Sequence, residues 1–218
     1  MNSEKNTLKD LTKLALFTKC LLLAQMFMSL LNIGDDLYLI WVYVAKIKPE
    51  EIPIFYEALM SVIDGFQSMI FLLGGIIFLI WTYKACSNAR ILSEDTMKYS
   101  PGWAVGWYFV PIYSLWKPYL AMKEIWIESH KGVNKPINKT YLLGIWWTLW
   151  ISSNILAQIS FNTGLSDNII VEYLVPSLLN LTAETLSIIM NLVVITIISI
   201  INNVQRVKED GSSIIREL

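Results

Sequence analysis

Four apolar stretches of the chain carry polar side chains at intervals of three and four residues. These intervals keep side chains on one stripe of an α-helix. Polar groups in apolar surroundings are costly and tend to face the interior of a helical bundle. We therefore predict a polar seam along each helix, with the four seams facing one another. The candidate seam residues are Gln25, Asn32, Asp36, Asp64, Ser68, Asn154, Gln158, Asn180, Glu184 and Asn191.

Three of these residues, Asp36, Asp64 and Glu184, are acidic, and no Lys or Arg shares their half of any stretch. Carboxylates without a basic partner are the groups that accept a cation or relay a proton in an apolar environment. Alternatively, a protonated Glu184 forms a hydrogen bond with Asn154 or Gln158. A third interpretation is purely structural, in which the polar side chains hold the helices together through interhelical hydrogen bonds.

No enzyme signature accompanies these residues. The sequence has no phosphate-binding Gly-rich loop, no metalloprotease helix and no nucleophile elbow. Asp36 and Asp64 lie near one end of their stretches, whereas an intramembrane aspartyl site requires two aspartates at mid-depth. One histidine and two cysteines are too few for a metal centre. We therefore expect no catalytic, cofactor-binding or metal-binding residues and no enzymatic activity.

The composition explains why the polar residues stand out. The chain has 218 residues, of which 55% are hydrophobic and 16% are charged. An ordinary soluble domain has about 25% charged residues. A soluble protein of this length could not bury so much apolar surface in one core, and the same numbers exclude a disordered chain and a disulfide-rich scaffold. The net charge of −1 excludes a global basic field for nucleic acid.

The apolar stretches are long enough to cross a membrane as helices, which takes about 20 residues each. The ten-residue alternation of a membrane β-barrel is missing from the sequence. The predicted fold is an all-α integral membrane protein with a four-transmembrane-helix bundle. The predicted spans are 14–34, with or without an extension to 44, then 60–83, 141–161 and 173–201. They form a single domain over 14–203, between an N-terminal tail 1–13 and a C-terminal tail 204–218. Because 14–44 is too long for a straight span, its end is tilted, broken at Gly34 or interfacial.

The basic residues predict the orientation of the spans. The residues up to Lys19, the region 84–139 and the C-terminal tail hold all Lys and Arg residues except Lys46 and Lys48. Cytoplasmic segments of membrane proteins are enriched in Lys and Arg. Both termini and the region 84–139 are therefore predicted to be cytoplasmic, and the loop 162–172 is predicted to lie outside.

Between the second and third spans lies an aromatic segment, 101–129. Its apolar run from Trp103 to Trp116 is interrupted by Pro111 and is short for a span, which is typical of re-entrant or interfacial segments. An amphipathic helix is predicted to follow, with Trp and Tyr anchors in the headgroup layer. The tryptophans are predicted to form an interfacial belt, and the alternative is a groove for an apolar ligand. A fifth span over 103–127 is the rival interpretation, and the charge asymmetry opposes it.

Three sequence blocks carry a resemblance to a known family. They are YKACSNARIL at 83–92, SPGWAVGWYFVPIYSLWKPYLAMKEIW at 100–126 and GIWWTLWISSNILAQISF at 144–161. They resemble the DUF4328 family of bacterial membrane proteins, over about residues 80–203. The family pattern usually has an arginine where Lys117 stands. The resemblance implies a helical fold and the bacterial inner membrane, and it implies no mechanism. The candidate motif residues are Arg90, Pro101, Gly102, Trp103, Trp107, Pro111, Trp116, Lys117, Pro118, Tyr119 and Trp126.

Two functions remain open at this point. The first is a non-enzymatic membrane scaffold that acts through lipid, including anionic headgroups on the cytoplasmic side, through a protein partner or as a homo-oligomer. The alternative is a small transporter or channel that uses Asp36, Asp64 and Glu184 for a cation or a proton. A cavity that reaches Glu184 would favour transport, and a dry, packed seam would favour the scaffold.

Overall fold

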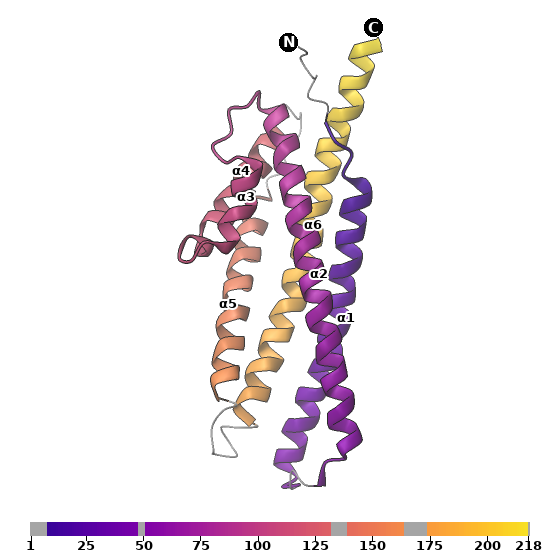
Figure 1. The fold of residues 1–218 in the computed structure, drawn as a ribbon, viewed down its shortest axis with the longest axis vertical. Coiled ribbons are helices and arrows are strands. Elements are labelled where there is room, and N and C mark those ends of the chain that lie inside the picture. The colour runs from indigo at the N-terminus through magenta and orange to yellow at the C-terminus, as the bar shows by residue number, and fades with distance from the viewer. Residues whose placement is uncertain (1–7, 48–50, 132–138, 164–173, 218) are drawn as a thin grey trace. The chain divides into compact units, whose positions relative to one another are not determined.

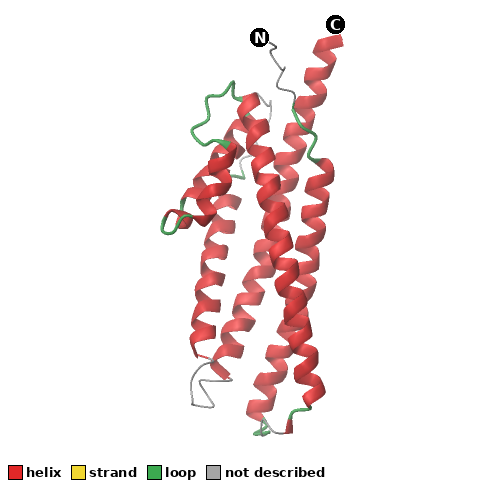
Figure 2. Ribbon diagram, viewed as in Figure 1, coloured by secondary structure: helices red, strands yellow, loops and turns green. Residues whose placement is uncertain are grey.

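A computed structural model describes residues 8–47, 51–131, 139–163 and 174–217, with side chains up to Lys208. These residues form helices and turns and include no strand (Figure 2). Most of the loop 162–172, which we predict to lie outside the cell, and the first part of the tail 1–13 fall outside the described residues.

Four long helices account for most of the described chain (Figure 1). They are α1 (Thr12–Val44), α2 (Ile54–Leu92), α5 (Tyr141–Thr163) and α6 (Val175–Glu217). All four are long and apolar enough to cross a membrane. Each predicted span falls within one of these helices, apart from the first residues of the fourth, at 173–174. Helix α1 continues through Gly34, so the predicted break there is wrong, and α6 extends through most of the predicted tail 204–218.

Short elements fill the region between α2 and α5. They are α3 (Pro101–Gly106), the 3-10 turns η2 (Trp107–Phe109) and η3 (Tyr113–Leu115), and α4 (Lys117–His130), and they pack on one another. The Ser100 hydroxyl caps α3 by accepting a hydrogen bond from the Trp103 N–H at 3.3 Å, and Pro101 follows at the position where a helix tolerates proline. No single helix covers 103–127, so the rival prediction of a fifth span is wrong.

The turn between η2 and η3 is strained. Ile112 has φ 67° and ψ −55°, and the Tyr113 N–H donates to the Pro111 carbonyl at 2.8 Å. These values define the rare γ-turn with a positive φ, which is unfavourable for a β-branched residue. The Ile112 side chain is 70% exposed at this turn.

The chain divides into two compact units, each assembled from separate parts of the sequence. The first unit contains residues 1–20, 75–145 and 193–218, and the second contains 21–74 and 146–192. The four long helices each contribute segments to both units. Fully buried side chains from three helices form the core of the first unit. They are Trp81, Ala85, Cys86 and Ala89 of α2, Met122 and Ile125 of α4, and Ile198 and Ile201 of α6.

A buried amide network crosses this core. The Asn88 side chain exchanges hydrogen bonds with both backbone groups of Lys9, at 2.9 and 2.8 Å, and donates to Gln205 at 3.2 Å. The Gln205 amide donates to the Ala85 carbonyl at 3.0 Å and to the Ser129 hydroxyl at 2.8 Å. The network therefore ties α2, α4, α6 and the segment before α1 to one another.

We expect Gln205→Leu to lower the stability of the protein by about 2 kcal/mol, because its partners would remain buried without a hydrogen bond. The free energy of unfolding in detergent, measured by titration with SDS, gives the size of the effect. The matched control is Gln158→Leu, on an exposed face of α5, for which no destabilisation is expected. Equal stability of the two variants would contradict the structural role of the network.

Candidate functional site

Side chains from the four helical segments of the second unit line an open cavity of about 450 Å³. Its polar lining residues are Gln25 and Ser29 of α1, Gln67 and Ser68 of α2, Ser153 and Asn154 of α5, and Glu184 and Ser187 of α6. Its apolar lining residues are Phe71, Leu72, Trp150, Ala157, Ala183 and Met190. All four helices thus present polar side chains to a common space.

A chain of hydrogen bonds leads from the cavity to α1. The Gln67 amide donates to the Glu184 carboxylate at 2.8 Å, and its oxygen accepts a bond from the Asn32 amide at 2.8 Å. The same Asn32 amide lies 3.4 Å from a carboxylate oxygen of Asp64. Two carboxylates on different helices are therefore linked through two amides.

The partner of Glu184 differs from the predicted one. We expected Asn154 or Gln158, but the Asn154 amide donates to the Trp150 carbonyl of its own helix at 2.7 Å. Gln158 is exposed and does not line the cavity. Gln67, which donates to Glu184, was not among the predicted seam residues. It follows Asp64 by three residues on the same helical face, so the spacing that revealed Ser68 could also have revealed Gln67.

Other seam residues also lie apart from the cavity lining. Asp36 and Asn191 are 5% and 1% exposed, and neither lines the cavity. Asn180 is half-buried and likewise lies outside the lining. The structure therefore gathers Gln25, Ser68, Asn154 and Glu184 at the cavity and connects Asn32 and Asp64 to it through Gln67.

The second unit is strongly acidic. The sequence of its two parts, 21–74 and 146–192, has nine acidic residues and two lysines. One of these carboxylates, Asp35, accepts a hydrogen bond from the Tyr56 hydroxyl. A surplus of one charge sign attracts the opposite charge to a cleft. The described residues contain no group of three His, Cys, Asp or Glu side chains that could hold a metal ion.

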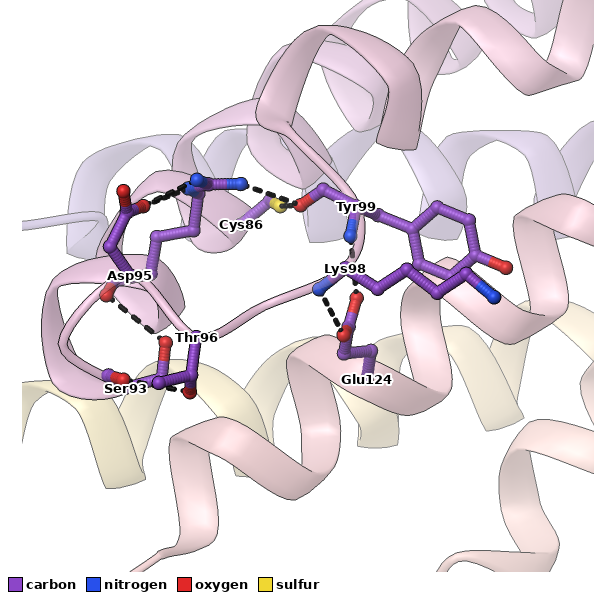
Figure 3. A network of polar contacts seen from close by, with 8 residues as sticks. Cys86, Ser93, Asp95, Thr96, Lys98, Tyr99 and Glu124 are labelled. Atoms are coloured by element: carbon purple, nitrogen blue, oxygen red, sulfur yellow. Dashed lines mark hydrogen bonds and ion pairs between the residues drawn. The ribbon is translucent and has the colours of Figure 1, made fainter.

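The loop after α2 is held by a separate network in the first unit, shown in Figure 3. Arg90 donates to the Asp95 carboxylate through Nε at 2.6 Å and to the Tyr99 carbonyl at 3.3 Å. The Glu124 carboxylate of α4 accepts hydrogen bonds from the backbone N–H groups of Lys98 and Tyr99, at 2.6 and 2.9 Å. Arg90 and Glu124 therefore fix the path of the loop, which is a structural role.

The aromatic motif residues divide into two groups. Trp103 stacks on Trp107 with ring centroids 4.5 Å apart, and Trp103 and Trp116 are 54% and 40% exposed. The Lys117 ammonium lies 5.5 to 5.9 Å from the ring centres of Tyr99, Trp107 and Tyr113. Trp126 is different, because it is 2% exposed and stacks on His130. The prediction that Trp126 belongs to an interfacial belt is therefore wrong, since its ring belongs to the core of the first unit.

Four further motif residues lie in or beside the short helical elements and differ in their exposure. Pro118 is buried in the first turn of α4, Tyr119 is half-buried, and Gly102 and Pro111 are exposed. None of them contacts the cavity of the second unit, whose lining comes entirely from the long helices.

Comparison with known proteins gives one match. A family model described as "Domain of unknown function (DUF4328)" matches residues 50–203. No curated protein and no solved structure matches the chain. The match covers α2 to most of α6 and includes Gln67, Trp150 and Glu184 of the cavity.

We expect a thiol placed at Ser187 to react with a cationic thiosulfonate reagent at least about tenfold faster than with an anionic one, because the acidic unit concentrates cations. Both rates are normalised to those of a free thiol. The background is Cys20→Ala, since Cys86 is fully buried. In the control, a thiol at the exposed Ile155, outside the cavity lining, is expected to show no such preference. A Ser187 thiol that reacts with neither reagent would show that the cavity is closed to water.

Proposed function

The chain belongs to the DUF4328 family, and we propose that it is a small membrane protein that binds a cation in the cavity of its second unit and carries it across the membrane. The observation that carries this proposal is the position of Glu184, which lines a cavity of about 450 Å³ and accepts a hydrogen bond from Gln67 there. Ionisable groups inside membrane helices mark substrate or ion pathways by default.

The geometry favours transport over a scaffold. A seam that only holds helices together needs no cavity, whereas ligand sites are concave and have a few polar groups within an apolar lining. The lining of this cavity has that composition, with Glu184 as its one carboxylate. The proposal includes no enzymatic step, and it leaves the scaffold function as the second candidate.

We place the protein in the inner membrane of a bacterium, as a multi-pass protein with both termini in the cytoplasm. The distribution of basic residues supports this orientation, since the three parts of the first unit contain all but two of the Lys and Arg residues. The segments of the second unit then adjoin the outer loops, so its cavity takes up cations from outside.

The second candidate function, a membrane scaffold, includes contact with lipid, and one observation favours that contact. Six large apolar side chains between 103 and 116 are exposed in the described structure. They are Trp103, Phe109, Ile112, Tyr113, Leu115 and Trp116. Since α2 and α5 join this segment to two candidate spans, we propose that it lies in the cytoplasmic interface, with Lys side chains near anionic headgroups.

We expect proteoliposomes that contain the protein to dissipate an imposed gradient of a cation, and Glu184→Gln to reduce the rate about tenfold or more, because the lining loses its one charge. A voltage dye and an internal pH dye, read in parallel for sodium, potassium and choline chloride gradients, measure the flux. Glu57→Gln removes an exposed carboxylate from α2 and should leave the flux unchanged. Equal flux with Glu184→Gln would refute the role of the cavity.

We expect a spin label at Ile112→Cys to be more accessible to oxygen than to a water-soluble nickel complex in bilayers, because the turn at Ile112 would lie among acyl chains. Power-saturation electron paramagnetic resonance, in the Cys20→Ala background, measures both accessibilities. A label at the exposed position 94, in the polar loop after α2, should show the opposite preference. A water-exposed label at 112 would show that the aromatic segment stands away from the membrane.

A further inference from the structure

We propose that the cavity takes an organic monovalent cation, such as a protonated amine or a quaternary ammonium compound, in preference to a bare metal ion. This inference rests on the proposed function, because it names the class of cation that the same cavity binds. Three features support it, namely the size of the cavity, the single carboxylate in its lining and the aromatic rings beside that carboxylate.

The size of the cavity suits an organic molecule. Its volume of about 450 Å³ falls within the range of about 300 to 1,000 Å³ that is typical of small-molecule sites. A bare cation such as Ca²⁺ is instead surrounded closely by about six to eight oxygen ligands. The lining offers one carboxylate, and the described residues hold no cluster of three acidic, His or Cys side chains.

The carboxylate is held in a fixed position at the cavity. The Gln67 amide donates to Glu184 at 2.8 Å, and the bond from Asn32 fixes Gln67 in turn. This arrangement uses one carboxylate oxygen and leaves the other available to a ligand ammonium group. A preorganised counter-charge recognises one positive charge and disfavours anions.

Two aromatic rings line the cavity together with this carboxylate. They belong to Phe71 of α2 and Trp150 of α5, and Trp150 stacks on Trp147 with ring centroids 4.8 Å apart. The negative face of an aromatic ring attracts an ammonium group, and Trp gives the strongest attraction. An organic cation is attracted by the rings and by the carboxylate together. A hydrated metal ion would have to give up bound water to enter such a lining, which costs free energy.

A polar atom in the lining is available to a ligand. The Ser153 Oγ is buried and has no hydrogen-bond partner among the described residues. A buried hydroxyl without a partner is costly, and a ligand that carries an N–H or O–H group would satisfy it. A protonated amine would satisfy this hydroxyl, whereas a quaternary ammonium compound would be held by the carboxylate and the rings alone.

The test is a calorimetric titration of the purified full-length chain with benzyltrimethylammonium chloride, in nanodiscs of zwitterionic lipid and in sodium-free buffer. We expect saturable binding. Glu184→Gln should weaken it about 30-fold or more, and Trp150→Leu about fivefold. The matched controls, Glu57→Gln and Trp41→Leu, remove an exposed carboxylate and an exposed indole elsewhere in the second unit and should bind as the wild type does.

Glu184→Gln should fold, because the new amide oxygen can still accept the bond from Gln67. Its thermal unfolding midpoint checks this, and Glu184→Asp, which keeps the charge, serves as a second variant with an expected affinity between the other two. Benzyltrimethylammonium binding that is equal in wild type and Glu184→Gln would overturn the inference, because it would reflect partition into an apolar space.

Parallel titrations with sodium and potassium chloride separate this inference from the proposed function. Glu184-dependent binding of sodium or potassium without binding of benzyltrimethylammonium would overturn the inference and leave the proposed function standing. Binding of none of the three cations, together with the absence of flux in proteoliposomes, would remove both. Binding of benzyltrimethylammonium that survives an excess of sodium would support both.

Discussion

The structure depends on one constraint, namely that a polar side chain within an apolar helix needs a partner, on its own helix, on another helix or at a cavity. Glu184 meets this constraint in the second unit through the amide of Gln67, which is itself held by Asn32. Because the amide accepts and donates at the same time, it joins three helices around one carboxylate. Without such a partner, the desolvated charge would oppose folding.

The first unit meets the same constraint without a cavity. Asn88 and Gln205 are 1% and 3% exposed, and their amides bind each other, backbone groups of α2 and of the segment before α1, and the Ser129 hydroxyl of α4. Such a network fixes which helices pack together, because the amides have partners in that arrangement alone. In the second unit a comparable amide chain ends at the cavity, and this difference supports the proposal that the cavity is a binding site.

The sequence predicted the parts of the fold that follow from apolar length and helical period. The spans could be predicted because a run of about 20 apolar residues crosses a membrane as a helix and has few other stable structures there. The seams could be predicted because an interval of three or four residues places two side chains on the same face of a helix. Hydrogen-bond partners could not be predicted in this way, since the rotation of each helix decides whether Glu184 meets Gln67, Asn154 or Gln158.

The aromatic segment shows a second limit. Trp103 and Trp126 have the same residue type and lie in the same motif, yet one is 54% exposed and the other 2%. The helical wheel placed Trp126 on an apolar face correctly, but it could not tell whether lipid or the core of the first unit covers that face. Packing of α4 against the long helices decides this, and it depends on contacts between residues far apart in the sequence.

One interpretation is that the seam residues only hold the helices together through hydrogen bonds. It accounts for Asn32 and Gln67 and leaves other residues unexplained. A hydrogen-bond network stabilises the fold when every buried polar group has a partner. A partly satisfied network gives less stability than apolar packing would. The Ser153 hydroxyl, which lines the cavity, is buried and has no hydrogen-bond partner among the described residues. Glu184 lines the same cavity as Ser153. Polar groups that cost stability at a cavity are better explained by a ligand that satisfies them than by a role in folding.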